Sequence, residues 1–187
     1  MENEADWAEP NLVVPWPRPG GHTPDGLECV WAWEHADMTR PRRPLPLRSY
    51  SSTVQGPGGD PAILIESLEV RPGQKICLTF ESADPSCRQG LFLGTAGLLS
   101  VAGATSPQLN LWTDSAPPEV LIDVLETDGS LVLYNIWDSG RGRRSQSHTS
   151  GMILEHLADN GRRYWCTDFG STPDFGKLVF RISFDDR

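Results

Sequence analysis

The sequence predicts an all-β fold, and three observations support this prediction. The 187 residues include 18 glycines and 16 prolines, which favour turns and interrupt helices. From residue 62 onward, apolar and polar residues alternate over short stretches separated by turn signals. No segment shows a convincing helical period. We therefore expect a single-domain antiparallel β-barrel or β-sandwich of about ten strands, with short connections between neighbours.

The N-terminal part of the chain departs from this pattern. Residues 1–27 are rich in proline and glycine and contain Trp7 and Trp16, so they predict an irregular strap whose tryptophans dock on the domain. Residues 28–35 (ECVWAWEH) alternate in character and predict the first strand of an all-β domain spanning residues 28–187. Residues 40–61 predict a long irregular loop, either a functional cover or a disordered connection.

The remaining strands follow in order from alternation and turn signals. Arg71-Pro72-Gly73 separates the first two of them, Gly97 divides two short apolar runs, Pro117-Pro118 precedes another, and Asp128-Gly129 marks a further turn. The predicted strands are 62–70, 75–81, 90–95, 98–103, 108–114, 119–127, 131–138, 150–157, 162–168 and 177–184.

The dipeptide Asn160-Gly161 is the strongest hairpin signal and predicts a two-residue turn. In that register His156 stands opposite Trp165, and Glu155 stands opposite Cys166. Each face of the hairpin then mixes apolar and polar side chains. Such mixing suits a barrel strand that lines a partly polar cavity, or alternatively an edge hairpin with both faces half exposed.

Composition excludes several classes of function. The net charge of −9 and the isoelectric point near 4.8 oppose binding to nucleic acid, which depends on cationic side chains. The acidic N-terminus lacks the features of a secretory signal, and no apolar run approaches the length of a membrane span, so we expect a cytoplasmic protein without membrane contact. The four cysteines are expected to be free thiols, and no histidine or cysteine spacing indicates a metal or other cofactor.

Candidate catalytic residues come from the predicted hairpin. Histidine is readily recruited as a general acid or base near neutral pH, and we expect that His156, Glu155 or Asp168 polarises a substrate. The competing interpretation of each residue is structural. Large aromatic side chains are expected to shape an enclosed pocket around them, namely Trp31, Trp33, Trp137, Tyr164 and Trp165.

A second candidate region is the loop within WDSGRGRRSQSHTSG, from Ser139 to Ser150, predicted as a long hairpin connection. It gathers positive charge in an acidic chain, and an arginine fork suits a carboxylate or phosphate group. The functional interpretation is a mobile lid or anion clamp that uses Arg141, Arg144 and His148. The competing interpretation is a solvated loop whose charge keeps the hairpin soluble.

In architecture alone, an acidic single-domain barrel with an N-terminal strap resembles the cofactor-independent cyclases of bacterial natural-product pathways. The resemblance implies a small-molecule-binding barrel, acting as a cyclase or isomerase on an apolar metabolite, and it supplies no catalytic residues. The alternative is a non-catalytic β-sandwich module that recognises a carbohydrate or protein partner, with Trp112 as a binding platform. The expected partners are a small-molecule ligand and, as one option, a second copy of the chain in a homodimer.

Overall fold

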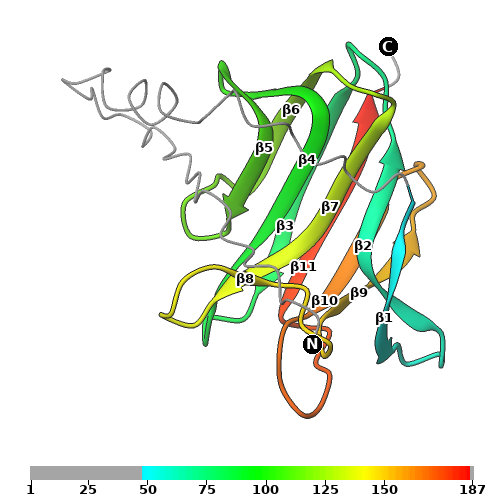
Figure 1. The fold of residues 1–187 in the computed structure, drawn as a ribbon, viewed down its shortest axis with the longest axis vertical. Helices are drawn as coiled ribbons and strands as arrows, with labels where there is room; N and C mark the ends of the chain where they lie inside the picture. Colours follow the sequence, from blue (N-terminus) through cyan, green and yellow to red (C-terminus); the bar gives the residue numbers. More distant parts are fainter. Residues whose placement is uncertain (1–47, 186–187) are drawn as a thin grey trace, which may run out of the picture.

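The computed structural model describes residues 48–185 (Figure 1), so the predicted strap at 1–27 and the predicted strand at 28–35 lie outside the described residues. Within residues 48–185 the chain forms eleven strands and no helix, which confirms the all-β prediction. In this part of the chain there is accordingly no helix that could cross a membrane.

The strands are β1 (Tyr50–Gln55), β2 (Pro61–Glu69), β3 (Lys75–Ala83), β4 (Arg88–Val101), β5 (Ala104–Trp112), β6 (Glu119–Glu126), β7 (Ser130–Asp138), β8 (Arg144–Ser145), β9 (Gly151–His156), β10 (Arg162–Thr167) and β11 (Leu178–Asp185). Eight of them form a closed antiparallel barrel in the order β2-β9-β10-β11-β3-β6-β4-β7. The ring closes because β7 pairs with β2. Of the two predicted architectures, the structure therefore has the barrel. The other three strands extend it, β1 beside β2, β5 beside β4 and β8 beside β7.

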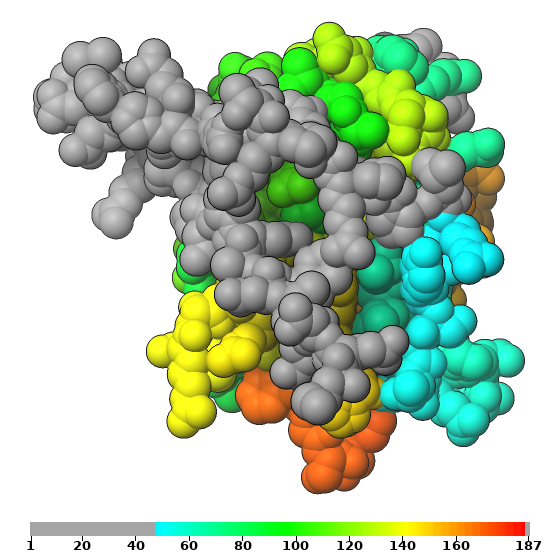
Figure 2. All heavy atoms as spheres, viewed as in Figure 1, coloured from blue at the N-terminus to red at the C-terminus, as the bar shows by residue number. Residues whose placement is uncertain are grey.

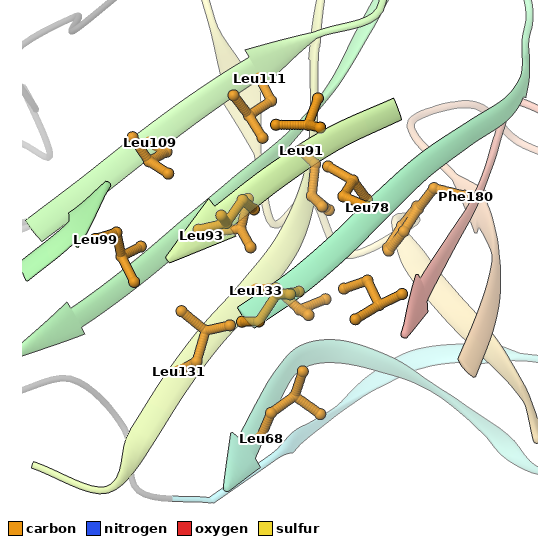
Figure 3. Close-up of a cluster of buried hydrophobic side chains, with 14 of the residues drawn as sticks. Leu68, Leu78, Leu91, Leu93, Leu99, Leu109, Leu111, Leu131, Leu133 and Phe180 are labelled. Atoms are coloured by element: carbon orange, nitrogen blue, oxygen red, sulfur yellow. The ribbon is translucent and has the colours of Figure 1, made fainter. Parts of the chain in front are cut away.

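A packed hydrophobic core fills the described interior of the barrel (Figure 3). Alternate side chains of each strand point inward, so Leu91 and Leu93 of β4 meet Leu133 of β7, and all three are fully buried. Tyr164 of β10 stacks on Phe180 of β11 with ring centroids 4.8 Å apart. Burial of each such large apolar side chain contributes about 2 kcal/mol. The packed interior therefore stabilises the barrel.

Two predicted boundaries are wrong. The expected loop at 40–61 contains β1, which forms a hairpin with β2 through a turn closed by the Gly56 amide donating to the Asp60 carbonyl at 2.8 Å. The two runs predicted at 90–95 and 98–103 belong to one strand, β4, because an irregularity between Gly94 and Leu99 bends the strand without ending it.

The segment from Ser139 to Ser150 is not a hairpin connection. In the barrel, β2 lies between β7 and β9, so the segment crosses from one strand to a strand that is not its neighbour. It contains the short strand β8, which pairs with the end of β7 through Ile136 and Trp137. The prediction failed because strand order is decided by the whole barrel, and the residues of the segment carry no information about it.

The β9–β10 hairpin also has a different register from the predicted one. Arg162 pairs with His156, Tyr164 pairs with Leu154, and the connection is a five-residue loop, 157–161. The loop is closed by a hydrogen bond from the Leu157 amide to the Gly161 carbonyl (2.9 Å). Asn160 in this loop has φ of 60°, a left-handed conformation that asparagine tolerates. The signal for a turn was therefore sound, but the turn is longer than two residues.

This register separates the two faces of the hairpin. Tyr164 and Cys166 point into the core together with Met152, and all three are fully buried. Trp165, which alternates with them, points outward and is 40% exposed. The mixed faces that favoured a strand lining a polar cavity were a consequence of the wrong register.

Candidate functional site

Polar side chains replace the hydrophobic core at one end of the barrel. On β4 the inward positions run from Leu93 through Leu91 to Gln89, and on β7 from Leu133 to Asn135. Gln89 and Asn135 are nevertheless 1% and 2% exposed. This end, which is the lower one in Figure 1, is where β3, β7 and β10 finish and β4, β6 and β11 begin.

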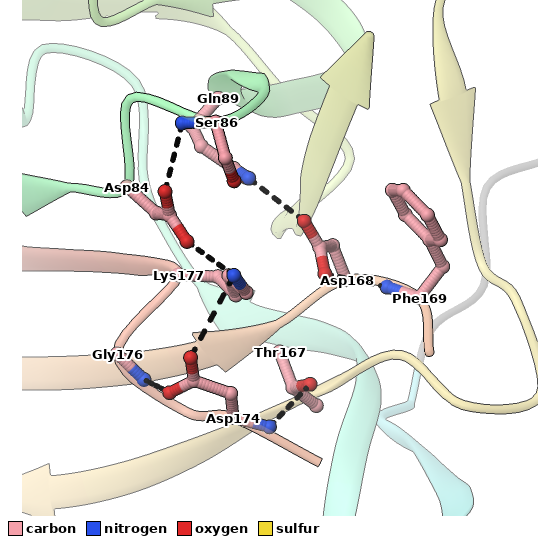
Figure 4. A network of polar contacts seen from close by, with 9 residues as sticks. All are labelled: Asp84, Ser86, Gln89, Thr167, Asp168, Phe169, Asp174, Gly176 and Lys177. Carbon is pink, nitrogen blue, oxygen red and sulfur yellow. Dashed lines mark hydrogen bonds and ion pairs between the residues drawn. The ribbon is translucent and has the colours of Figure 1, made fainter. Parts of the chain in front are cut away.

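The centre of this polar layer is a pair formed by Gln89 and Asp168 (Figure 4). The Gln89 Nε2 donates a hydrogen bond of 2.8 Å to Asp168 Oδ2. The other Asp168 oxygen, Oδ1, accepts from the Phe169 amide at 2.6 Å. Asp168 is 2% exposed, and no cationic side chain within residues 48–185 forms an ion pair with it. A buried carboxylate is thus held by neutral donors.

The position of Asp168 follows from the end of β10. Asn135 Nδ2 donates to the Thr167 carbonyl at 3.0 Å, and the Thr167 hydroxyl accepts from the Asp174 amide at 3.1 Å. These two bonds tie the last residue of β10 to β7 and to the following loop. Because Asp168 comes next in the chain, its carboxylate is directed at Gln89.

Lys177, just before β11, joins the β3–β4 connection to the β10–β11 connection at this end of the barrel (Figure 4). Its ammonium group contacts the carboxylate of Asp84 directly and lies 3.7 Å from Asp174 Oδ2. The hydrogen bond from Lys177, followed by that from the Ser86 amide, lowers the pKa of Asp84 to about 2. Asp84 in turn raises the pKa of Lys177. Both groups are therefore charged across the physiological pH range.

An open cleft of about 570 Å³ lies against this layer. Its walls come from the end of β3, the β3–β4 connection, the start of β4 and the β5–β6 connection. The lining residues are Phe80, Glu81, Ser82, Ala83, Asp84, Pro85, Cys87, Arg88, Gln89, Thr113, Asp114, Ala116 and Pro118. A cleft of this size accommodates a small molecule.

The lining of the cleft contains more carboxylates than cationic side chains. Three of its lining residues are carboxylates, Glu81, Asp84 and Asp114, whereas Arg88 is the cation of the lining. Arg88 is already engaged, because its Nε donates to Asp114 at 2.8 Å and its guanidinium lies 4.4 Å from the centre of the Trp112 ring. The other two carboxylates are paired with cations outside the lining, Glu81 with Arg163 and Asp84 with Lys177.

Cys87 in this cleft is a free thiol, as are Cys77 and Cys166, in agreement with the prediction for these three cysteines. Burial, and next the negative charge of Asp168, raise the pKa of Cys87. The thiol is therefore less ionised at neutral pH than an exposed cysteine, which argues against a nucleophilic role.

Within residues 48–185 there is no group of three histidine, cysteine, aspartate or glutamate side chains that could hold a metal ion.

The structure does not bring the three predicted catalytic residues together. Asp168 lies in the buried layer just described, whereas His156 and Glu155 are exposed at the far end of the β9–β10 hairpin. His156 pairs with Arg162, six residues before Asp168, so the two ends are about 20 Å apart at ~3.3 Å per residue. The three side chains therefore do not form one group, and a catalytic role for any one of them stays a prediction.

The predicted aromatic pocket is also not found in the described part of the chain. Tyr164 is part of the packed interior, and Trp165 lies outside, donating from Nε1 to Glu155 at 3.3 Å. Trp137 is buried at the polar end and packs against Phe169 with ring centroids 6.1 Å apart. Trp31 and Trp33 lie outside the described residues. Within residues 48–185, aliphatic side chains pack in the barrel interior, and Trp137, Tyr164 and Trp165 do not gather around a common space. The aromatic pocket stays a prediction.

The arginine-rich segment projects from the surface, as the yellow region in Figure 2 shows. Arg141, Arg144 and His148 are exposed. The two glycines of this segment serve a turn, because Asp138 Oδ1 accepts hydrogen bonds from the Gly140 and Gly142 amides at 2.7 and 3.0 Å. The role of these three side chains as an anion clamp stays a prediction.

Sequence reasoning missed Gln89, Asn135, Asp84 and Lys177. A signal existed for the first two, because each is a polar residue in phase with inward leucines of the same strand. No local signal existed for the pair of Asp84 and Lys177, which are 93 residues apart.

Comparison with models of known protein families, with curated proteins and with solved structures found no match. The class of protein is therefore defined by its own fold and site. It is a closed antiparallel β-barrel with a packed interior and an acidic cleft at one end.

Proposed function

We propose that the protein is a small-molecule-binding β-barrel whose ligand, a small polar molecule carrying a protonated amine, binds in the acidic cleft at the barrel end. One observation carries the proposal. Gln89 Oε1 is buried where Gln89 lines the cleft, and it accepts no hydrogen bond from any described residue. A buried acceptor without a donor costs roughly 1–3 kcal/mol, and a ligand donor that reaches it recovers this energy.

Asp168 is a positioning residue in this proposal. By accepting a hydrogen bond from Gln89 Nε2, it fixes the orientation of the carboxamide and keeps Oε1 directed away from itself. The opposite orientation would place the amide oxygen against the carboxylate, which is repulsive. Asn135 and Thr167 support this arrangement by holding the end of β10.

The charge of the cleft favours an amine over a neutral or acidic ligand. Glu81 and Asp114 keep 29% and 56% of their side chains exposed, so both remain accessible to a ligand although each already has an arginine partner. A charge-assisted hydrogen bond is roughly twice as strong as a neutral one. The ammonium group would therefore provide affinity, and Gln89 would select a donor in the correct position.

The proposal is limited to binding. A cyclase or isomerase that acts on an apolar metabolite needs an apolar chamber in which the substrate is folded, and the described interior is filled by the core. A carbohydrate ligand, which was part of the alternative interpretation, fits the polar lining better. An amino sugar combines both required features, hydroxyl donors and an ammonium group.

The proposal is tested with glucosamine and glucose as matched probes, using isothermal titration calorimetry and NMR of the full chain. We expect glucosamine to bind about tenfold or more tightly than glucose, the ratio that a charge-assisted hydrogen bond of roughly 1.5–3 kcal/mol produces. The Gln89 side-chain amide resonances should shift on binding. Equal affinity for the two sugars, or no perturbation of Gln89, would contradict the proposal.

Variants distinguish the cleft from general electrostatic attraction. Gln89→Met should remove binding, and Asp114→Asn should reduce the preference for glucosamine over glucose. Asp159→Asn is the matched control, because Asp159 is an exposed aspartate at the opposite end of the barrel, paired with Arg181. Asp168→Asn should weaken binding and should also shift the Gln89 side-chain amide resonances of the free protein, because it removes the acceptor that orients the carboxamide. If Asp168 served only to stabilise the fold, these resonances would not need to shift.

A further inference from the structure

Trp165 presents an exposed indole on the outside of the barrel. Of the three tryptophans within residues 48–185, it alone is exposed, with 40% of its surface accessible. The hydrophobic core lies on the opposite face of β10, where Tyr164 and Cys166 point inward. The indole is therefore available for contact with a ligand, and it is not needed to fill the interior.

The neighbours of Trp165 fix its orientation. Its Nε1 donates to Glu155 Oε2 of β9 at 3.3 Å, and the same oxygen accepts a hydrogen bond from Arg163 Nη1 at 3.3 Å. Arg163 is held in turn, because its Nε and Nη2 donate to the two carboxylate oxygens of Glu81 at 2.8 and 3.0 Å. Trp165, Glu155 and Arg163, here named the outer platform, are thus arranged before any ligand binds.

The outer platform has unused capacity for hydrogen bonds. Both contacts of the Glu155 carboxylate are made by Oε2, so Oε1 accepts no hydrogen bond from a residue of the described chain. The side chain of Glu155 is 47% exposed. A ligand hydroxyl that donates to Oε1 would form a charge-assisted hydrogen bond. The platform therefore combines an apolar ring face with an accessible acceptor beside it.

A sugar has the chemistry that matches this combination. One face of a pyranose ring consists largely of C–H groups, which pack on an aromatic ring, and its edge carries hydroxyl donors. A purely apolar ligand would cover Trp165 and leave Glu155 without a donor. An anionic ligand is disfavoured, because Glu81 and Glu155 together outnumber the one guanidinium group of Arg163.

The outer platform lies close to the cleft at the barrel end. Strands β10, β11 and β3 lie side by side (Figure 1), and in their register Trp165 pairs with Val179, which pairs with Ser82. Ser82 and Glu81 line the cleft, so Trp165 is two strand spacings, or about 10 Å, from its wall. Glu81 belongs to both places, because it lines the cleft and also holds Arg163.

We infer that the ligand is an oligosaccharide of at least two sugars, with the first sugar in the cleft and the second stacked on Trp165. The inference rests on the proposed function, because the first sugar is the amino sugar assigned to the cleft. A disaccharide is long enough to span the separation between the two positions. The pair of Glu81 and Arg163 lies between them and offers polar contacts to the hydroxyl groups along the ligand.

The test compares glucosamine with its β-1,4-linked dimer, using isothermal titration calorimetry and NMR of the full chain. We expect the dimer to bind about tenfold more tightly than glucosamine, because the second sugar adds the stacking contact. The indole N–H resonance of Trp165 should shift with the dimer and not with glucosamine. The side-chain amide resonances of Gln89 should shift with both sugars.

Variants connect this preference to the indole. Trp165→Ala should reduce the affinity ratio of dimer to glucosamine from about tenfold to about one. Leu121→Ala is the matched control, because Leu121 is 62% exposed on β6 and lies outside the outer platform, so this variant should retain the ratio. Urea denaturation shows whether both variants are folded as the unaltered chain is.

The results separate the inference from the proposed function. If both sugars shift Gln89 but the dimer binds no more tightly than glucosamine, the inference is overturned and the proposed function stands. The same holds if Trp165→Ala keeps the full ratio. If neither sugar shifts Gln89, the proposed function fails and the inference fails with it.

Discussion

Arg162 of β10 donates a hydrogen bond of 3.0 Å to Glu66 of β2, across the intervening strand β9. Glu66 is 5% exposed. Burial raises the pKa of Glu66, and the positive charges of Arg162 and then His156 oppose that increase. The contact with Arg162 therefore limits the increase in the pKa of Glu66 that burial causes.

Arg162→Gln should consequently destabilise the protein in a pH-dependent manner. Because the pKa of Glu66 is raised on folding, the stability of the protein decreases as the pH rises above the unfolded-state pKa of Glu66, about 4.5. Removal of Arg162 raises the folded-state pKa further and therefore extends this decrease. We expect a decrease in the free energy of unfolding of about 3 kcal/mol near pH 7.5, and a smaller decrease near pH 4, measured by urea denaturation. Arg163→Gln is the control, because its partners Glu81 and Glu155 lie at the surface, so the cost should stay below about 1 kcal/mol. An equal loss at both pH values would contradict this account of Glu66.

The strands were predictable because alternation reflects a property of each strand alone, namely which face is buried. The register of the β9–β10 hairpin was not, because Asn160 satisfies a left-handed position in a two-residue turn and in the observed five-residue loop alike. What decides between them is the packing of β9, because the observed register places Leu154 and Met152 opposite Tyr164 and Cys166, with Met152 in the core. Local signals thus located the hairpin, and the core set its register.

The candidate site was predicted only in part for the same reason. Asp168 could be proposed from the sequence, since a carboxylate beside an apolar strand is a candidate for function. Its partner Gln89 is 79 residues away, and only the barrel closure brings the two together. The position of Gln89 in phase with the inward leucines of β4 was the available signal, and it indicates a polar layer without indicating what that layer contacts.

Acid titration should reveal the contact between Asp84 and Lys177. Because the pKa of Asp84 is lowered to about 2, the stability that it contributes is complete above its ordinary pKa near 4 and is lost as the pH falls toward 2. Lys177→Met should return the pKa of Asp84 toward the ordinary value, as measured by carboxyl NMR. Lys75→Met, which breaks the separate surface pair with Asp123, should leave the titration of Asp84 unchanged. A titration of Asp84 that does not move in Lys177→Met would show that Lys177 is not the cause.

Two tyrosine hydroxyls should respond in opposite ways to removal. Tyr164 is fully buried, and its hydroxyl makes no hydrogen bond of good geometry within residues 48–185, although Arg162 lies near it. Tyr164→Phe should therefore be neutral or stabilising by up to about 1 kcal/mol. Tyr134→Phe removes the acceptor for Arg143 and should cost about 1 kcal/mol. Thermal and urea denaturation of the two variants make the comparison. A clear loss of stability in Tyr164→Phe would show that its hydroxyl has a partner, such as a buried water.

Gly97 should tolerate no side chain, because the bend in β4 brings it against the end of β6. A Cβ at this position would lie 2.1 Å from the carbonyl oxygen of Glu126, and the obstructing atoms are backbone, which cannot rotate away. Gly97→Ala should therefore lower the free energy of unfolding by about 3 kcal/mol, the upper part of the range for overpacking. Gly58→Ala is the matched control, since the nearest atom to its Cβ would be a flexible carboxylate oxygen of Asp60 at 3.9 Å, and it should change stability by less than about 0.5 kcal/mol. Equal stability of the two variants in urea denaturation would mean that β4 does not bend at Gly97 as described, and the passage of this strand from β7 to β6 would need another explanation.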